Sequence, residues 1–210
     1  MSTAAVTPDY WEQACAHLMK KDRVMRRLVP QFPGVHLESR GDPFVTLARS
    51  IVGQQISVKA AQTVWDRFAT LMPQVTPGRV LKLDTEALRA AGLSARKVEY
   101  IQDLAQHFVD KRANIKKWAE LGDEEIIAEL IAIRGIGRWT AEMFLIFHLM
   151  RPDVLPVDDV GLVNGVSQLY FSGEAVSRNE LREVAAAWAP YRSVATWYIW
   201  RSLEPEPVAY

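Results

Sequence analysis

Two adjacent carboxylates, Asp158 and Asp159, follow "LPV" and precede an apolar stretch that is typical of a helix. At a helix N-terminus the dipole and the unpaired N–H groups favour an ionised carboxylate. Such a group can stabilise a developing positive charge, or orient and deprotonate a water molecule. Neighbouring helical residues point about 100° apart, so one aspartate can cap the helix while the other faces a cleft. The residues alone do not decide which, and the alternative that both are caps stays open.

The stretch "IRGIGRWTAEMF" holds a second set of candidate residues. Gly135 and Gly137 interrupt a helical pattern, and both can adopt positive φ, which would allow a sharp turn between two helices. Free backbone N–H groups at the start of the second helix would bind phosphate. Carbonyls near Ile133 and Ile136 could hold a monovalent cation that bridges to the phosphate. The alternative is a plain glycine turn between two packed helices.

The elements that position these residues are helices. Apolar residues recur every three or four positions and the breaks carry proline, glycine or capping residues, so we predict an all-α fold without a strand pair. Asp123 is expected to cap one helix, and Gly92 to end another in a left-handed conformation. The expected helices cover residues 8–29, 44–57, 58–72, 84–92, 95–112, 122–133, 158–171 and 178–203, the last with a bend at Pro190. A further helix is expected from residue 138, and a short helical turn between residues 76 and 83.

Composition excludes several classes of site. The chain of 210 residues carries 25 basic and 25 acidic side chains, so no overall field attracts a polyanion and any such partner must be met locally. The single cysteine, Cys15, excludes a disulfide framework, a thiolate zinc site and a four-cysteine iron-sulfur cluster. The histidines lack paired ligand spacing, so we expect no cofactor and no metal on side chains. Without a signal-peptide pattern or an apolar stretch long enough for a membrane span, a cytoplasmic protein is expected.

A family resemblance joins the two motifs. "LIAIRGIGRWTAEMFLIF" followed by "VLPVDDVGL" resembles the helix-hairpin-helix (HhH-GPD) DNA glycosylase superfamily, in its DNA-3-methyladenine glycosylase II branch. "PFVTLARSIVGQQIS", "GLSARKVEYIQDLA" and "APYRSVATWYIW" match in the same order. The resemblance implies a two-lobe fold with an interlobe cleft and without the N-terminal sheet domain of longer relatives. One lobe of six helices would comprise residues 44–152, and the other residues 1–43 with 153–210.

The resemblance also implies an activity. It points to a monofunctional DNA glycosylase of base excision repair that hydrolyses the N-glycosidic bond of alkylated purines, of the 3-methyladenine and 7-methylguanine type, and leaves an abasic site. Asp159 would be catalytic and Asp158 its structural neighbour. Trp139 stands where bifunctional members carry a lysine nucleophile, which implies no lyase activity. The partner would be double-stranded DNA with damaged bases, bound by a monomer without a protein partner or membrane. A glycosylase for etheno-bridged or deaminated adenine, or a non-catalytic DNA-damage binding protein, stays open.

The base pocket would be aromatic. A cationic alkylated purine is attracted to electron-rich indoles, and Trp139 and Trp200 fall at the positions that the resemblance assigns to the pocket. Met143 lies one helical turn after Trp139, where relatives often have an aromatic residue, so the pocket would be more adaptable. Three other aromatics are expected in the core, namely Trp188, Trp197 and Tyr198.

Contacts with DNA are expected from two turns. Flipping a base leaves a gap in the stack, and the family fills it from the turn that follows Gly53 here. The matching residue is Gln55, with Ile56 as a second candidate, and a solvated glutamine pair as the alternative. Lys97 is a further candidate phosphate contact, and Arg192 could pair with Asp158 or support Asp159. The predicted phosphate-binding residues of the hairpin are Arg134, Gly135, Gly137, Arg138 and Thr140.

Overall fold

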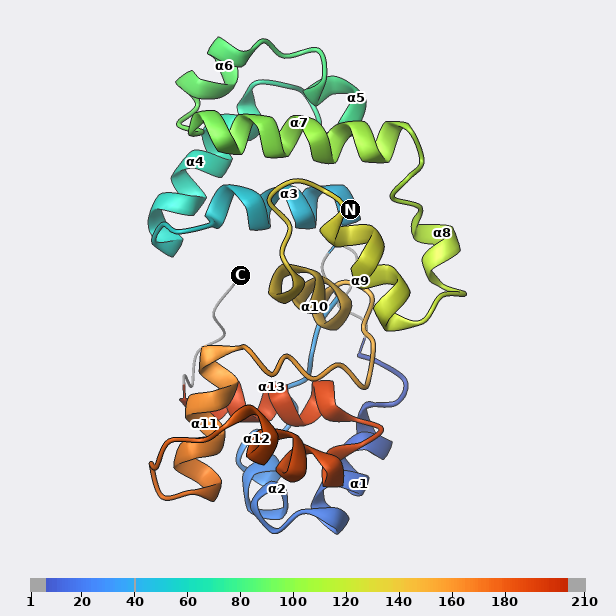
Figure 1. Cartoon of the computed structure of the whole chain (residues 1–210), viewed down its shortest axis with the longest axis vertical. Coiled ribbons are helices and arrows are strands. Elements are labelled where there is room, and N and C mark those ends of the chain that lie inside the picture. The colour runs from blue at the N-terminus through green and yellow to red at the C-terminus, as the bar shows by residue number, and fades with distance from the viewer. Residues whose placement is uncertain (1–6, 40, 204–210) are drawn as a thin grey trace. The chain divides into compact units, whose positions relative to one another are not determined.

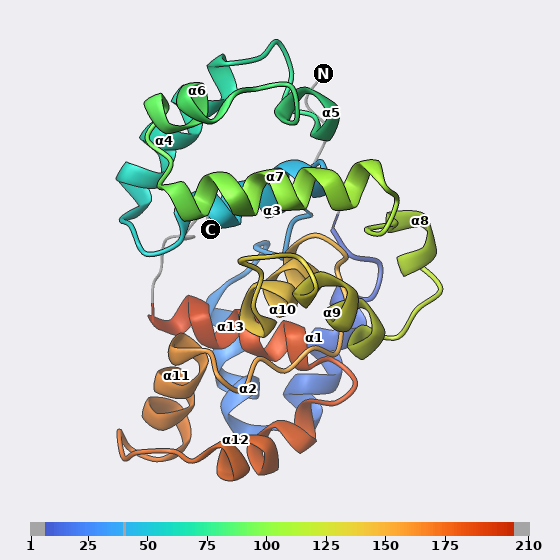
Figure 2. The ribbon, with the colours of Figure 1, turned by 45° about the horizontal axis from the view of Figure 1, so that its top comes forward.

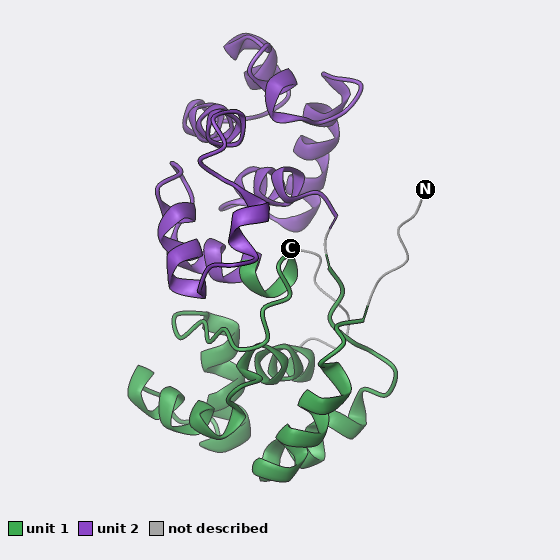
Figure 3. Cartoon of the chain, turned by 90° about the vertical axis from the view of Figure 1, so that its right-hand side faces the viewer, with its two compact units in different colours: residues 1–39, 145–208 green, residues 40–144, 209–210 purple. Residues whose placement is uncertain are grey.

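The computed structural model describes residues 7–39 and 41–203, and all regular structure in these ranges is helical. The all-α prediction is therefore confirmed. The chain divides into two compact units (Figure 3). We call residues 41–144 the central unit, and residues 7–39 with 145–203 the terminal unit. The division falls inside the helix 138–147, and the predicted lobe ranges stay a prediction.

The central unit holds most of α3 to α10 (Figure 1). The long helix α7 lies beside α3 and packs on α5 and α6 (Figures 1 and 2). Apolar side chains of α7 are buried in this packing, among them Val98, Ile101 and Leu104. The helices are α3 (Pro43–Gly53), α4 (Val58–Thr70), α5 (Pro77–Val80), α6 (Thr85–Ala90), α7 (Ala95–Val109), α8 (Ile115–Trp118), α9 (Asp123–Ile131) and α10 (Arg138–Phe147), whose last three residues belong to the terminal unit.

The terminal unit joins the two ends of the described chain. Its helices α11 and α13 pack against each other, and α13 also contacts α1 and α2. The core includes the aromatic residues expected there, because Trp188, Trp197 and Tyr198 are all buried. The helices are α1 (Trp11–Lys21), α2 (Arg23–Leu28), η1 (Val29–Gln31), α11 (Val160–Tyr170), α12 (Arg178–Ala185), η2 (Ala186–Trp188) and α13 (Arg192–Leu203).

The expected single helix over residues 8–29 is wrong, because Asp22 divides it. The residue adopts an extended backbone conformation, and its Oδ1 accepts from the N–H groups of Val24 at 2.7 Å and Met25 at 2.9 Å. Its Oδ2 accepts from the Tyr170 hydroxyl at 2.9 Å and the Trp188 indole at 3.0 Å. A buried carboxylate needs such donors, so tertiary partners fix the break.

Two further differences concern the start of α9 and the helix expected over residues 178–203. Gly122, and not Asp123, is the N-cap of α9, where the Glu125 carboxylate accepts from the Gly122 N–H at 2.9 Å. The expected helix over residues 178–203 is two helices, α12 and α13, linked through η2 and Pro190. Proline lacks the N–H that a continuous helix requires. The left-handed conformation expected at Gly92 is confirmed, with φ of 104°.

No helix of the described chain is long and apolar enough to cross a membrane. Within residues 7–39 and 41–203, no group of three or more His, Cys, Asp or Glu side chains could hold a metal ion.

Candidate functional site

Asp159 is a buried carboxylate at the N-terminus of α11. Its side chain caps the helix, with Oδ1 accepting from the Leu162 N–H at 2.6 Å. The same oxygen accepts from the Trp200 indole Nε1 at 2.8 Å. Only 8% of Asp159 is exposed, so two N–H donors orient a largely desolvated carboxylate. The aspartate for which the resemblance implies catalysis is therefore itself the helix cap.

Trp200 reaches Asp159 from α13, which packs against α11. Its ring stacks on Phe147, with centroids 5.7 Å apart and planes 14° apart. Gly161 leaves room for this contact, because an added Cβ would lie 3.1 Å from Asp159 Oδ1 and 3.2 Å from the indole. Sequence reasoning missed both Phe147 and Gly161. The position of Gly161, two residues after Asp159, was a signal in the sequence that could have indicated a close approach there. No feature of the sequence indicates that Phe147 stacks on Trp200.

Asp158 and Arg192 have other partners than predicted. Asp158 Oδ1 lies 2.5 Å from Arg178 Nε on the surface. Arg192 binds Asp153 with both arms of its guanidinium, at 2.7 Å each, and its backbone N–H donates to the same carboxylate at 3.2 Å. The predicted pairing of Arg192 with Asp158 is wrong. The planar guanidinium instead matches a carboxylate that faces the start of α13.

The stretch between α9 and α10 forms the predicted tight turn, but its two glycines differ. Gly135 has φ of 81°, and a Cβ there would lie 2.3 Å from the Tyr100 ring. Gly137 lies outside the left-handed region and a Cβ there would meet nothing within 4 Å, so of the two glycines only Gly135 adopts positive φ. The Ala141 N–H donates to the Gly137 carbonyl at 3.0 Å as α10 begins. The N–H groups of residues 138–140 precede this first bond and have no acceptor within α10 itself, and we call this N-terminus the open end of the helix.

Carbonyls of the turn have partners within the protein. The Ile136 N–H donates to the Ile133 carbonyl at 3.1 Å, and Gln54 Nε2 donates to the Gly135 carbonyl at 2.7 Å. A carbonyl oxygen has two lone pairs, so one hydrogen bond does not prevent cation binding. The cation near Ile133 and Ile136 stays a prediction.

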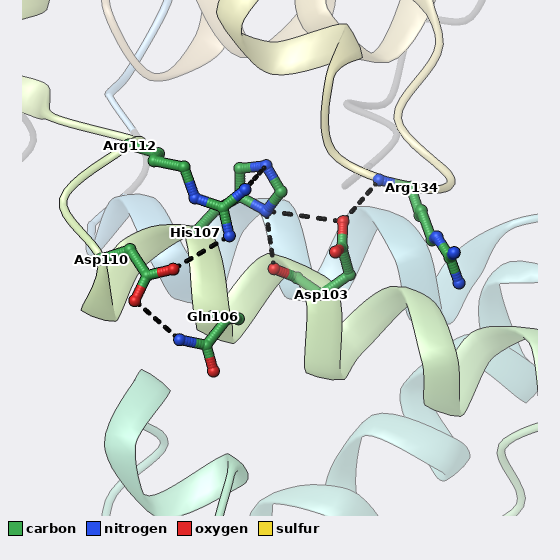
Figure 4. Close-up of polar contacts among 6 residues, drawn as sticks. All are labelled: Asp103, Gln106, His107, Asp110, Arg112 and Arg134. Atoms are coloured by element: carbon green, nitrogen blue, oxygen red, sulfur yellow. Dashed lines mark hydrogen bonds and ion pairs between the residues drawn. The ribbon is translucent and has the colours of Figure 1, made fainter.

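The arginines of the hairpin are held by carboxylates. Arg138 donates to Glu142 at 2.9 Å and with two nitrogens to Glu124, and the hydrogen bond with Glu124 is the main cause that raises the pKa of Arg138. Arg134 has an exposed side chain, but its backbone N–H donates to Asp103 Oδ2 at 2.8 Å (Figure 4). Thr140 is buried, at 9% exposed. The phosphate contacts of these residues stay predictions.

The turn after α3 presents both candidates for insertion into DNA. We define residues 53–57 as the wedge turn. Gln55 is exposed and has φ of 59°, and Ile56 is 40% exposed. Lys97, expected at a phosphate, instead donates through Nζ to the carbonyls of Val52 at 2.7 Å and Gln54 at 2.8 Å. Burial lowers the pKa of the Lys97 ammonium. The ammonium satisfies carbonyls at the C-terminus of α3 that lack a partner within the helix.

The predicted base-pocket residues lie in different units. Trp139 and Met143 belong to the central unit, and Trp200 to the terminal unit. Trp139 is 41% exposed although it is large and aromatic, whereas Met143 is buried at 7%. An exposed indole at the start of α10 is a surface on which a flat ring can stack.

Comparison with known proteins finds DNA repair proteins of one superfamily. Residues 48–190 match the family model of the HhH-GPD superfamily base excision DNA repair protein. DNA-3-methyladenine glycosylase 1 of Schizosaccharomyces pombe is 34% identical over 194 residues, which cover 89% of this chain and 85% of that protein. DNA-3-methyladenine glycosylase 2 of Escherichia coli is 29% identical over 185 residues, covering 83% of this chain and 62% of that protein.

A solved structure of the DNA-3-methyladenine glycosidase from Bacillus halodurans matches with a TM-score of 0.84 at 36% identity, covering 96% of this chain and 93% of that one. The S. pombe 3-methyladenine DNA glycosylase in complex with abasic DNA matches with a TM-score of 0.77 at 33% identity, covering 93% of this chain and all of that one. Since the family model spans more than half of the chain and these relatives match nearly all of it, the chain belongs to the HhH-GPD superfamily of base excision DNA repair proteins.

Proposed function

We propose that this protein is a DNA glycosylase of base excision repair that removes alkylated purines, of the 3-methyladenine and 7-methylguanine type, from double-stranded DNA. The observation that carries the proposal is the buried Asp159 carboxylate, held by the Leu162 N–H and the Trp200 indole. Relatives named DNA-3-methyladenine glycosylase, which match most of this chain, support it.

The proposed chemistry needs one carboxylate. As the C–N glycosidic bond breaks, the sugar carbon becomes cation-like, and a nearby negative charge lowers the energy of that state. Asp159 supplies this charge and orients or deprotonates the incoming water. Its donors fix the carboxylate before the substrate arrives, so little reorganisation is needed during the reaction. An alkylated purine is cationic and departs as a neutral base, which reduces the need for a general acid.

Base recognition is assigned to Trp139 and Trp200. Cation-π attraction between an indole and a cationic base contributes about 0.5 to 2 kcal/mol. Met143, buried and one helical turn after Trp139 on α10, would let the pocket adapt to more than one alkylated base. Gln55 or Ile56 would fill the gap that the flipped base leaves, while the open end of α10 holds a phosphate.

We further propose that the enzyme is monofunctional, because Trp139 cannot form a Schiff base with the sugar as a lysine amine does. Water then remains the nucleophile and the DNA strand stays intact. The proposed enzyme acts as a monomer in the cytoplasm and uses no cofactor.

Release of free base from methylated duplex DNA tests the activity. Under single-turnover conditions, Asp159→Asn should lower the rate about 100-fold or more, since an amide carries no negative charge. Asparagine is itself a good N-cap, so the variant should fold. Asp84→Asn is the matched control, because Asp84 also caps a helix, α6, by accepting from the Ala87 N–H at 2.6 Å. This variant should release base at the normal rate.

Three outcomes would change the proposal. No release by the unmutated protein rejects the activity on these lesions, and tight binding without release favours a damage-binding protein. Release of base only from DNA with etheno-bridged or deaminated adenine would replace alkylated purines as the proposed substrates. Strand cleavage, or a covalent complex trapped with borohydride on abasic DNA, contradicts the monofunctional assignment.

A further inference from the structure

The two turns proposed to contact DNA are joined directly by a hydrogen bond. Gln54 lies in the wedge turn next to Gln55, and its side-chain Nε2 donates to the Gly135 carbonyl at 2.7 Å. These residues are 81 positions apart in the chain and both belong to the central unit. The bond links the residue beside the candidate wedge to the middle of the hairpin turn.

The helix α7 contacts both turns. Lys97, Tyr100 and Asp103 are three residues apart and therefore share a face of this helix. Lys97 Nζ binds two carbonyls of the α3 C-terminus, including that of Gln54, and Asp103 Oδ2 accepts from the Arg134 N–H. The Tyr100 ring fills the space in which a Cβ of Gly135 would lie. One rigid helix thus sets the places of both turns.

Asp103 is itself fixed by a buried histidine (Figure 4). His107 Nε2 lies 3.2 Å from Arg112 Nη1, and because arginine only donates, Nε2 accepts and the proton is on Nδ1. That Nδ1–H donates to the Asp103 carbonyl at 2.9 Å and lies 3.5 Å from the Asp103 carboxylate. Asp103, which accepts from the Arg134 N–H, is therefore also oriented by His107.

We propose that Gln54 is a positioning residue for base flipping. Its amide fixes the wedge turn relative to the hairpin, so that a phosphate held at the hairpin sets where Gln55 enters the DNA. The inference rests on the proposed function, because it assigns DNA to both turns. A preformed spacing reduces the conformational entropy lost when both turns engage the DNA at once.

Gln54→Met tests this proposal, because methionine keeps the length of the side chain and removes the donor. Binding to two duplexes of one sequence is measured at fixed salt, one undamaged and one with a stable abasic-site analogue. The variant should weaken binding to the abasic duplex about tenfold, the upper end for one hydrogen bond, and change undamaged binding much less. The control Gln106→Met removes a donor from α7 that binds Asp110, 2.7 Å away and outside both turns, and should change neither affinity.

A double variant separates positioning from simple stabilisation. If Gln54 acts through Gln55, then Gln54→Met should have little further effect on the abasic preference once Gln55→Ala is present. Additive losses in the double variant would overturn the proposal. So would an equal loss of affinity for both duplexes together with a lower unfolding temperature, since that marks a structural role only. These measurements need no base release, so an inactive protein would reject the proposed function and still leave the positioning test decisive.

Discussion

Gly135 and Gly137 stand two residues apart but meet different physical demands. Gly135 has φ of 81° and sits against the Tyr100 ring, whereas Gly137 has open space around it. Gly135→Ala should therefore lower the free energy of unfolding by about 2 kcal/mol or more, from backbone strain plus the clash. Gly137→Ala should stay within about 0.5 kcal/mol of the unmutated protein. Urea denaturation measures both.

The two contributions at Gly135 can be separated. Tyr100→Ala in the Gly135→Ala background removes the ring and should recover the part due to the clash, but not the part due to positive φ. Equal stability of the two glycine variants would contradict the difference that we derive from the geometry of the turn.

At the residue scale, the sequence identified side chains but not their partners. Asp158 and Asp159 were both candidates because their chemistry and their place before a helix are local features, and only the family resemblance favoured Asp159. Lys97 and Arg138 were expected at phosphates because both are basic and lie near helix starts. Lys97 instead binds the carbonyls of Val52 and Gln54, which lie 45 and 43 residues away in the chain. Arg138 binds the carboxylate of Glu124, which lies 14 residues away. Such pairings depend on tertiary packing, which periodicity does not encode.

At the element scale, the contact between α11 and α13 positions Asp159 and Trp200 relative to each other. A Cβ on Gly165 would lie 2.2 Å from Ile199 Cγ2, so glycine allows the two helices to approach closely. Gly165→Ala should separate them, lower the free energy of unfolding by about 1 to 3 kcal/mol, and slow base release by displacing Trp200 from Asp159. Asn164→Ala, at the exposed neighbouring position, is the control.

Chemical denaturation and single-turnover base release together test this prediction. A stable Gly165→Ala protein with the normal rate would show that the spacing of α11 and α13 does not determine the geometry at Asp159. A second change, Ile199→Ala, removes the methyl group that the new Cβ would meet and should partly restore the rate.

Helix positions were largely predictable because local signals define them. Ser57, Asp84, Ser94 and Ser177 cap the helices that the sequence places after them. Asp22 is also a local N-cap, but it lies inside an apolar pattern that predicts one continuous helix, and the donors to its second oxygen, Tyr170 and Trp188, are distant in the chain. Local capping chemistry can be read from a sequence, whereas a break that depends on tertiary donors cannot.

At the scale of the whole molecule, charge sets how the protein can hold DNA. The chain has 25 basic and 25 acidic residues, and Arg138 at the hairpin is paired with Glu124 and Glu142. Binding would then depend on backbone N–H groups at the open end of α10 more than on free cations. Only phosphates neutralised by lysine or arginine release counterions, so the affinity should depend weakly on salt.

The slope of log affinity against log salt concentration measures this directly. Each phosphate neutralised by a cation contributes about 0.9 to the slope, so we expect a slope no steeper than about 4 between 50 and 200 mM salt. Glu124→Gln frees one arm of Arg138 and should steepen the slope by about one. Glu129→Gln adds the same charge by releasing Lys117, bound 2.6 Å away outside the hairpin, and should leave the slope unchanged. Equal steepening by both variants would show that net charge, and not the hairpin, controls the electrostatic part of binding.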